Sequence, residues 1–445
     1  MKVKVDFNNI CGPIKIMNAV NNAPVWKRNN DQNINNFESY KAAEIPYGRT
    51  HDASIDYGYG REHCVDVHGI FPNFDADEND PASYDFFLTD EYLNRFFLAG
   101  TKPFYRLGSC IEHWTKKYGT LPPKDFGKWA RICERIISHY NDGWADGHHM
   151  NIEYWEIWNE PDGSSDDAPP ENKLTWGGTR QQFFELYEIT ATYLKEKHPN
   201  CKIGGPALCY PHIEWTNAFL KYLTRDGKRV PLDFFSWHGY TNDPKKMIPA
   251  AHSARQMLDA HGYTETESIY NEWNYVNSFT GDQLVKDLAV VRSLKGAAFI
   301  GGIMTAMQGC PVDMLMYYDA RMSGFNGLWN MYDKTELKGY HALKSWGELR
   351  HYKNEAKSCS DDDEIYVVAG TDGGRGYILV TYYTDLENQP AKTVDIEISG
   401  APSEVWCHSR LDDDYDFDNP RNCRLHDGKL SFVMQPNTML KIFSK

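Results

Sequence analysis

Residues 152–160 read IEYWEIWNE, a short run of aromatic and β-branched side chains that ends in an asparagine and a glutamate. Such a run predicts a β-strand whose last residues are polar. A helix-like segment, FGKWARICERIISHY, precedes it at 126–140, and another, TRQQFFELYEITATYLKEKH, follows at 179–198. Alternating strands and helices are typical of parallel βαβ units, so this stretch favours an α/β fold.

The same alternation extends from about residue 12 to residue 350. A further helix-like segment, AAHSARQMLDAHG, begins at residue 250, a long apolar helix is predicted for 283–309, and 71–90 is predicted as a loop. Eight strands alternating with helices predict a (β/α)8 TIM barrel over residues 10–350. The predicted strands are PIKIMNA (13–19), IPYGRTH (45–51), KPFYRLG (102–108), IEYWEIWNE (152–160), CKIGGPA (201–207), LDFFSWHGY (232–240), ESIYNEWN (267–274) and VDMLMYY (312–318).

The character of the sequence changes after residue 352. Residues 353–364, KNEAKSCSDDDE, are polar and acidic and are predicted as a linker or an exposed turn. Six alternating runs follow without a helical pattern, which predicts a small C-terminal all-β sandwich domain over 355–445. Residues 1–9 also alternate and could add an edge strand to it. The six runs are EIYVVAG, GYILVTYY, KTVDIEIS, SEVWCHS, LSFVM and MLKIFSK.

Composition excludes several classes of partner. The formal charge of −15, without a basic run, argues against binding to nucleic acid. The sequence has no apolar run long enough to span a membrane. The N-terminus lacks the apolar region of a signal peptide, and none of the ten cysteines forms a CxxC pair. We therefore expect a cytoplasmic protein with free thiols, although removal of a signal peptide would leave the same sequence.

Two glutamates end predicted strands and are the candidate catalytic residues. Glu160 ends the fourth strand, within Trp155 to Pro161, and Glu272 ends the seventh, in SIYNEWN. In a (β/α)8 barrel the active site forms at these strand ends, and strands four and seven face each other across the mouth. Glycosidases use two such carboxyl groups, one to protonate the leaving oxygen and the other to attack the anomeric carbon. This pair predicts a retaining glycoside hydrolase.

The segment Trp155 to Pro161, together with Glu272, resembles the retaining glycosidases of the 4/7 superfamily. Over nearly its full length the chain is most similar to glycoside hydrolase family 39, which contains β-xylosidases and α-L-iduronidases. The resemblance implies Glu160 as acid/base, Glu272 as nucleophile, no cofactor, and a homo-oligomer as the possible assembly. We expect β-xylosidase-like removal of a terminal sugar from an oligosaccharide or glycoside. The alternatives are an α-L-arabinofuranosidase, β-galactosidase or α-L-iduronidase activity, or a non-catalytic sugar-binding relative.

The resemblance also implies supporting residues around the sugar. Arg49 would hydrogen-bond Glu272 and hold it ionised. His51 would line the sugar site, and Asn159 would bind the 2-hydroxyl group of the sugar. Further substrate-binding candidates, all near the ends of strands six to eight, are His238, Tyr240, Trp273 and Tyr318.

Two features leave the substrate open. Strand eight reads MYYDAR (316–321), where the xylosidases of the family typically present a Trp-x-Phe run. A uronic acid would need a cation in the sugar site, for which Arg106 and Arg321 are the candidates, although Arg106 could equally form a structural ion pair.

Histidines outside these strands do not predict a metal site. They lack the spacing of known metal motifs, so we expect no bound metal. A metal-dependent hydrolase on the same barrel is the rival function, and a chelator would inhibit it. The histidines considered are His63, His68, His148 and His149.

Overall fold

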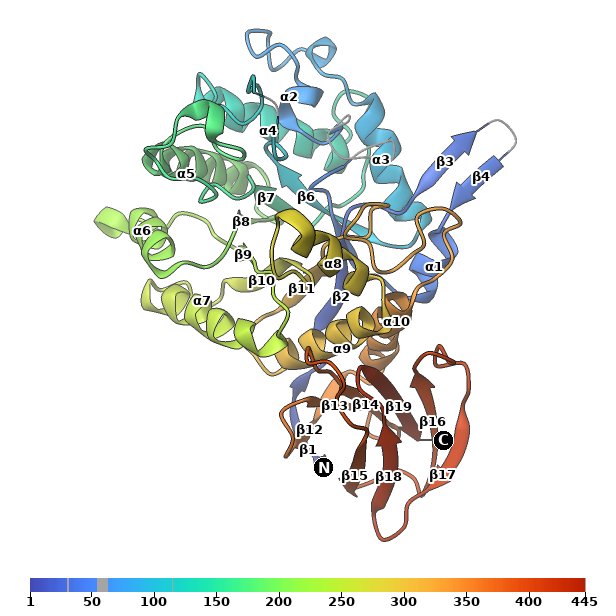
Figure 1. Ribbon diagram of the computed structural model, residues 1–445. Coiled ribbons are helices and arrows are strands. Elements are labelled where there is room, and N and C mark those ends of the chain that lie inside the picture. Colours follow the sequence, from blue (N-terminus) through green and yellow to red (C-terminus); the bar gives the residue numbers. More distant parts are fainter. Residues whose placement is uncertain (30–31, 54–62, 114, 445) are drawn as a thin grey trace.

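A computed structural model describes residues 1–29, 32–53, 63–113 and 115–444. A closed barrel of eight parallel strands forms the larger part of the molecule, and an all-β domain that contains the N-terminal strand and the C-terminus lies beneath it (Figure 1). The barrel confirms the predicted (β/α)8 fold, and each of the eight predicted strands is present. Around the barrel they are β2 (Ile16–Asn21), β5 (Tyr47–Arg49), β6 (Lys102–Leu107), β7 (Tyr154–Ile157), β8 (Lys202–Leu208), β9 (Phe234–His238), β10 (Glu267–Trp273) and β11 (Met314–Tyr317).

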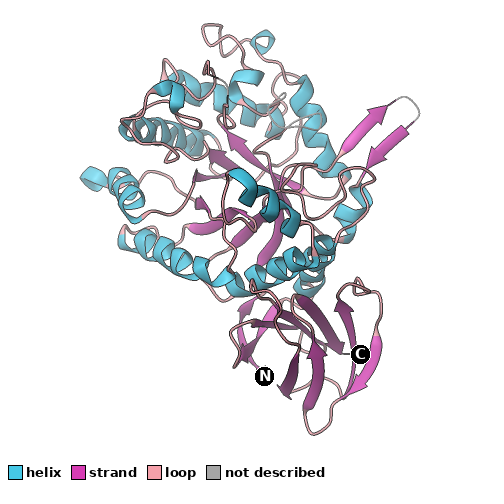
Figure 2. Cartoon of the chain, viewed as in Figure 1, coloured by secondary structure: helices cyan, strands magenta, loops and turns pink. Residues whose placement is uncertain are grey.

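Helices surround the barrel on its outside (Figure 2). Short 3-10 turns at Pro81–Ser83, Pro170–Asn172, Arg225–Gly227 and Pro244–Met247 join some of the elements. The α-helices are α1 (Phe37–Ala42), α2 (Val67–Ile70), α3 (Phe87–Leu98), α4 (Phe126–Asn141), α5 (Arg180–Lys197), α6 (Ile213–Leu223), α7 (Ile248–Ala260), α8 (Gly281–Val291), α9 (Leu294–Gln308) and α10 (Lys338–Arg350).

Helices α3, α6 and α10 were not predicted from sequence. Each follows a residue whose side chain makes no capping hydrogen bond, namely Phe86, His212 and Leu337, so one of the sequence signals for a helix start is missing. Helix α3 also begins inside the segment 71–90 that was predicted as loop.

The single long helix predicted for 283–309 is instead two helices, α8 and α9. The Ser293 hydroxyl accepts a hydrogen bond from the backbone N–H of Gly296 and starts a new helix, and the two helices are bent by 81°. No single helix among the described residues is long and apolar enough to cross a membrane; α8 and α9 meet that test only when they are taken together across their bend.

Alternate strand residues point into the barrel, where they form two layers. The layer nearer the amino ends of the strands is apolar and includes Tyr47, Phe104, Tyr154 and Phe234. Two residues further along the same strands the inward side chains become polar and buried, as in Arg49, Arg106, Glu156 and Ser236. The change from apolar to polar toward the carboxyl ends of the strands places the chemistry at one mouth of the barrel.

The all-β domain is one continuous sheet whose two halves enclose an apolar core. Outside both parts, a two-stranded hairpin, β3 (Trp26–Asn29) and β4 (Gln32–Asn35), projects from the barrel (Figure 1). In sheet order the domain strands are β17 (Arg421–Arg424), β16 (Val405–Leu411), β19 (Thr438–Ser444), β14 (Gly376–Tyr382), β13 (Ile365–Thr371), β12 (Asn354–Ser360), β1 (Lys2–Pro13), β15 (Lys392–Ser399) and β18 (Lys429–Met434).

Two sequence-based expectations about this domain were wrong. Strand β1 is an interior strand, not an edge, because it pairs with β12 on one side and with β15 on the other. The segment predicted as a linker or turn contains β12. Its side chains are largely polar because most of them remain partly or fully exposed, with Ala356 as the buried exception, while its backbone pairs with β1 and β13.

Helix α9 packs directly on the all-β domain. A Cβ atom added at Gly301 would lie 2.6 Å from Met439 Cε and 2.6 Å from Thr381 Oγ1, both of which belong to that domain. An ion pair also links the domain to helix α10, since Lys441 Nζ lies 2.8 Å from Glu348 Oε2. The close approach of α9 therefore depends on the missing side chain at residue 301.

Replacing Gly301 by leucine is expected to reduce the free energy of unfolding by about 1–3 kcal/mol, because the added side chain must push α9 away from the sheet. Urea denaturation followed by circular dichroism measures the change. The matched control is Gly309→Leu, at an exposed position just after α9 where the nearest atom to an added Cβ is 3.8 Å away. Equal losses in the two variants would contradict the tight-contact explanation.

Candidate active site

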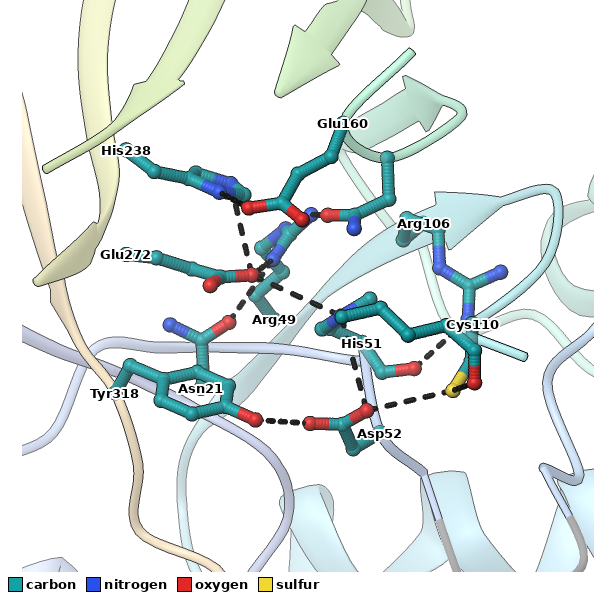
Figure 3. A network of polar contacts seen from close by, with 12 residues as sticks. Asn21, Arg49, His51, Asp52, Arg106, Cys110, Glu160, His238, Glu272 and Tyr318 are labelled. Carbon is teal, nitrogen blue, oxygen red and sulfur yellow. Dashed lines mark hydrogen bonds and ion pairs between the residues drawn. The ribbon is translucent and has the colours of Figure 1, made fainter. Parts of the chain in front are cut away.

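The carboxyl ends of the barrel strands bring most of the predicted site residues into one polar network (Figure 3). Arg49 ends β5, His238 ends β9, and Glu272 lies near the end of β10. Asn159 and Glu160 follow β7, and Tyr240 follows β9. These strands are far apart in sequence, and barrel closure is what places their ends around one space.

Arg49 is fully buried and joins three strands at this mouth. Its Nε donates to Glu156 Oε2 over 2.6 Å, and its Nη1 donates to Glu272 Oε1 over 2.6 Å. Its Nη2 donates to Asn159 Oδ1 over 2.7 Å. A guanidinium group can serve several acceptors at fixed angles, so Arg49 sets the orientation of both Glu272 and Asn159.

Glu272 receives hydrogen bonds at both carboxylate oxygens. Besides the contact with Arg49, the Tyr240 hydroxyl donates to Glu272 Oε2 over 2.8 Å. His238 Nε2 lies 3.5 Å from Glu272 Oε1, and His51 Nε2 lies 3.8 Å from the same oxygen. The two donors, Arg49 and Tyr240, hold the carboxylate in one orientation at the barrel mouth.

Glu160 lies in a different environment, with histidine and a thiol as its neighbours. His238 Nδ1 is 2.9 Å from Glu160 Oε1, and the Cys209 thiol hydrogen-bonds the same carboxyl group. The backbone at Glu160 has a φ of 47°, in the left-handed region that non-glycine residues seldom adopt. Its N–H donates to the Ala207 carbonyl oxygen over 2.8 Å, and Thr175 Oγ1 donates to its carbonyl oxygen over 2.6 Å. Strain of this kind, held by surrounding bonds, is typical of functional sites.

Burial raises the pKa values of both carboxyl groups, and their neighbours partly offset this rise. It raises the pKa of Glu160 to about 7, partly offset by the Cys209 thiol and by the charge of Arg49. Burial also raises the pKa of Glu272, while the charge of Arg49 and the Tyr240 hydroxyl act in the opposite direction. The direct ion pair favours ionised Glu272, because neutralising it would leave the Arg49 charge buried beside one fewer carboxylate.

His238 is neutral at neutral pH, because burial lowers its pKa to about 4. Its two ring nitrogens face Glu160 and Glu272, so a neutral imidazole lies between the two carboxyl groups. The atoms that Glu160, His238 and Glu272 direct at one another all lie within 4.8 Å.

Tyr318 and His51 line the opposite side of the same space. The Tyr318 hydroxyl donates to Asp52 Oδ2 over 2.5 Å, and its ring lies 6.1 Å from that of Tyr240. His51 Nε2 lies between Asp52 Oδ1 at 3.7 Å and Glu272. Asp52, which sequence patterns did not single out, therefore connects the predicted residues that follow β5 and β11.

One predicted substrate-binding residue does not join the site. Trp273 is fully buried, and its ring packs against Tyr317 at 5.2 Å and against Phe299 of α9 at 6.4 Å. Strand β10 does not alternate regularly here, because its register with both neighbouring strands shifts after Tyr270. Glu272 therefore faces the barrel mouth, and Trp273 faces the helices. Its side chain therefore lies away from the space between Glu160 and Glu272, and nothing in the structure supports the predicted role in substrate binding.

The two arginines considered for a uronic acid are both engaged with carboxylates. Arg106 Nη2 lies 2.5 Å from Asp66 Oδ1 and 2.7 Å from the His51 carbonyl oxygen. Arg321 Nη2 lies 3.2 Å from Asp319 Oδ2 and 3.4 Å from Asp52 Oδ2. Their positive charges are thus matched by acidic side chains already in place.

Sequence reasoning also missed the layer of side chains beneath the site. Glu156 is fully buried, and its Oε1 accepts hydrogen bonds from Ser236 Oγ and Asn271 Nδ2, both over 2.6 Å. Asn21 Oδ1 accepts from Arg49 over 3.2 Å. Glu156 carried a detectable signal, because it alternates with Tyr154 on the inward face of the same strand, whereas nothing local marked Cys209 as a neighbour of Glu160.

Three groups among the described residues have the side chains to hold a metal ion. Two of them, Glu160–His238–Glu272 and Asp52–His63–Cys110, lie in the network. Each contains a carboxylate close to an arginine: Arg49 at 2.6 Å from Glu272, and Arg321 at 3.4 Å from Asp52. A bound dication there would meet these cations at short range, which disfavours metal binding at the barrel mouth. The third group, Asp90–His139–His148, lies elsewhere.

Fold and site together define a (β/α)8-barrel protein with two convergent carboxyl groups at the ends of strands four and seven. The sequence profile of the glycosyl hydrolases family 39 matches residues 18–272. The chain therefore belongs to glycosyl hydrolase family 39.

The chain is also similar in sequence to an individual glycosidase. A β-xylosidase from Geobacillus stearothermophilus is 28% identical over 204 residues, which cover 42% of this chain and 37% of that protein. The alignment thus spans little more than a third of that relative's length.

Solved structures share the fold over almost the whole chain. A glucosidase from Croceicoccus marinus has a TM-score of 0.77 at 21% identity, covering 99% of this chain and 98% of that one. A family 39 β-xylosidase from Caulobacter crescentus has a TM-score of 0.67 at 18% identity, covering 100% and 99%. At such identities the similarity concerns the fold.

Replacing Arg49 by methionine is expected to cost about 3–5 kcal/mol of unfolding free energy, since Glu156 and Glu272 would be left buried without their cation. Urea denaturation at neutral pH measures this loss. The control Arg131→Met removes a partly exposed ion pair with Glu78 (2.7 Å) and is expected to cost about 0–1 kcal/mol. Similar losses in both variants would show that Arg49 is not the central contact of the network.

Proposed function

We propose that this protein is a retaining glycoside hydrolase that removes a terminal sugar by double displacement, with β-xylosidase-like specificity. The observation that carries the proposal is the approach of Glu160 and Glu272, whose facing oxygens lie within 4.8 Å. Retaining glycosidases hold their carboxyl groups about 5–5.5 Å apart, whereas inverting enzymes leave about 6.5–9.5 Å for a water molecule.

In the first step Glu272 attacks the anomeric carbon, and Glu160 gives its proton to the departing glycosidic oxygen. The C–O bond to the leaving group breaks as the C–O bond to Glu272 forms. In the second step Glu160, now a carboxylate, takes a proton from water, and the resulting hydroxide equivalent displaces Glu272. The sugar leaves with its original anomeric configuration, and both carboxyl groups return to their starting states.

The neighbouring residues support these roles. Arg49 and Tyr240 stabilise the charge of Glu272 between turnovers. Asn159 uses its oxygen to accept from Arg49, so its buried Nδ2, without a hydrogen-bond partner among the described residues, can donate to a sugar hydroxyl. A bond to the 2-hydroxyl of this kind strengthens in the transition state.

A neutral sugar suits the site better than a uronic acid. Arg106 and Arg321 already pair with carboxylates, and the buried acids Asp52 and Glu156 add negative charge nearby. Among the described residues, a sugar carboxylate would meet like charges while Arg106 and Arg321 are already paired, at an energetic cost. A β-xyloside is therefore favoured over an α-L-iduronide, with arabinofuranoside and β-galactoside as the remaining alternatives.

The pH profile of kcat/KM on a substrate with a poor leaving group, such as xylobiose, is expected to fall on the basic side with an apparent pKa of about 7. This limb reports loss of the Glu160 proton, since only protonated Glu160 can donate to the leaving oxygen. The Cys209 thiol stabilises the Glu160 carboxylate, so Cys209→Ala should move the limb to higher pH. Cys209→Ser, which keeps a donor, should not, and Cys359→Ala at an exposed site serves as control. A limb that moves to lower pH in Cys209→Ala would contradict this role.

A panel of nitrophenyl glycosides (β-xyloside, α-L-arabinofuranoside, β-galactoside, β-glucoside and an α-L-iduronide analogue) tests the function itself. We expect turnover of the β-xyloside and its loss in Glu272→Ala. Glu160→Ala should lose about 10²–10⁴-fold on xylobiose, but less on the nitrophenyl substrate, whose leaving group needs little protonation.

Azide distinguishes the two carboxyl groups. In Glu272→Ala it should attack from the opposite face and give the inverted glycosyl azide, whereas in Glu160→Ala it should give the azide with retained configuration. Full activity in both variants would overturn the assignment, and activity that is lost in a chelator and restored by metal would favour a metal-dependent hydrolase. Binding of sugars without any turnover of the panel would favour a non-catalytic relative.

A further inference from the structure

Away from the barrel mouth, three side chains converge on one point between two outer helices. Asp90 lies in the first turn of α3, His139 in the last turn of α4, and His148 in the segment 142–151, which lies between α4 and β7. His139 Nε2 lies 3.3 Å from Asp90 Oδ1, and His148 Nε2 lies 3.4 Å from the same oxygen. All three atoms lie within 4.8 Å of one another.

The hydrogen bond at the other ring nitrogen fixes the tautomer of His139. Its Nδ1 lies 2.9 Å from the Trp144 carbonyl oxygen, which can only accept, so Nδ1 carries a hydrogen. In a neutral imidazole, Nε2 then presents a lone pair to the carboxylate of Asp90. Two acceptors facing each other at 3.3 Å repel unless a cation lies between them.

Hydrogens on the two imidazole rings alone explain poorly why both Nε2 atoms lie so close to Asp90 Oδ1. Asp90 Oδ1 already accepts a hydrogen bond from the Tyr140 hydroxyl over 3.0 Å. If both imidazoles carried a hydrogen at Nε2, a single oxygen would have to accept three hydrogens, and His139 would be an imidazolium. One dication bound by the two imidazole nitrogens and the carboxylate removes both conflicts.

The geometry fits such an ion. Zinc bound tetrahedrally at about 2.0–2.1 Å from nitrogen and oxygen separates neighbouring ligand atoms by about 3.3 Å. The two distances from Asp90 Oδ1, 3.3 and 3.4 Å, have this value. A carbonyl bond to the non-coordinating nitrogen, as in His139, is the arrangement that orients metal-binding histidines. Among the described residues, Asp90 forms no ion pair with lysine or arginine, in contrast to the carboxylates of the barrel mouth.

We propose that Asp90, His139 and His148 form a binding site for a divalent cation of the zinc type, with water as the fourth ligand. His139 is buried, whereas the side chains of Asp90 and His148 are 34% and 39% exposed, which leaves room for water. Two imidazoles and one carboxylate suit zinc better than calcium or magnesium, which prefer oxygen ligands. The proposal revises the expectation of ordinary histidines, since His148 was considered there without His139 or Asp90.

The ion would fasten the segment 142–151 to the rest of the barrel. This segment already runs back along α4, because His148 N–H donates to the His139 carbonyl oxygen over 2.6 Å and Met150 N–H to that of Tyr140 over 2.7 Å. It leads into β7, the strand that Glu160 follows. The role of the site is structural and does not depend on the proposed glycosidase activity.

Titration of the chelator-treated full-length protein with zinc chloride, followed by calorimetry, tests the site. We expect one zinc ion per chain and a Tm that rises with zinc concentration. His148→Gln should weaken binding by at least about 100-fold, because a ligand is lost where changes behind the ligands alone cost 10–100-fold. Asp90→Asn, which can still accept from Tyr140, is a second variant with the same expectation.

His149→Gln is the matched control, because this neighbouring exposed histidine lies outside the cluster and should leave zinc affinity unchanged. X-ray absorption at the zinc edge should show nitrogen and oxygen neighbours without sulfur, which separates this site from the cluster containing Cys110. Chelation should lower the Tm but leave turnover intact below the unfolding temperature. Absence of zinc binding, or equal affinity in wild type and His148→Gln, would overturn the proposal and identify an ordinary histidine–carboxylate cluster.

Discussion

The burial of one guanidinium group organises the mouth of this barrel. Arg49 has no exposed surface, yet its nitrogens contact Glu156, Glu272 and Asn159 at 2.6–2.7 Å. A buried charge is tolerated only when it is paired and hydrogen-bonded on all sides, so the surrounding strands must supply acceptors at fixed positions. Two of the residues that satisfy Arg49, Glu272 and Asn159, are also those to which the proposed mechanism assigns roles, so burial of this charge places the groups that the proposed chemistry uses.

Around this fixed charge, the two carboxyl groups differ through their neighbours. Glu272 contacts Arg49 and the Tyr240 hydroxyl, both of which favour an ionised carboxylate. Glu160 contacts neutral His238 and a thiol, and burial raises its pKa to about 7. Distinct environments for two chemically identical side chains are what acid and nucleophile roles require. The neutral state of His238 matters here, because an imidazolium at 2.9 Å would favour the ionised form of Glu160 instead.

The second domain depends on the two ends of the chain. Strand β1 begins at Lys2 and lies between β12 and β15, so the N-terminus completes a sheet whose other strands come from beyond residue 353. Helix α9, one of the barrel's own helices, packs against that sheet through Gly301. Both the N-terminal and the C-terminal strands lie in this domain. The barrel and the domain are therefore held together by contacts between segments that are far apart in the sequence.

The sequence by itself determined the eight barrel strands, because each is a short apolar run with a polar end, and it singled out Glu160 and Glu272 as catalytic candidates because both end such runs. It could not give the inward or outward direction of Trp273, the new helix start at Ser293, or the pairing of polar β12, since each depends on neighbours distant in the chain. Tertiary structure alone decided that Cys209 contacts Glu160, that Glu156 supports Arg49, and that His139 meets His148 over Asp90. Local patterns report what one segment prefers, whereas pKa values and ligand geometry depend on charges and donors that come together only when the barrel closes.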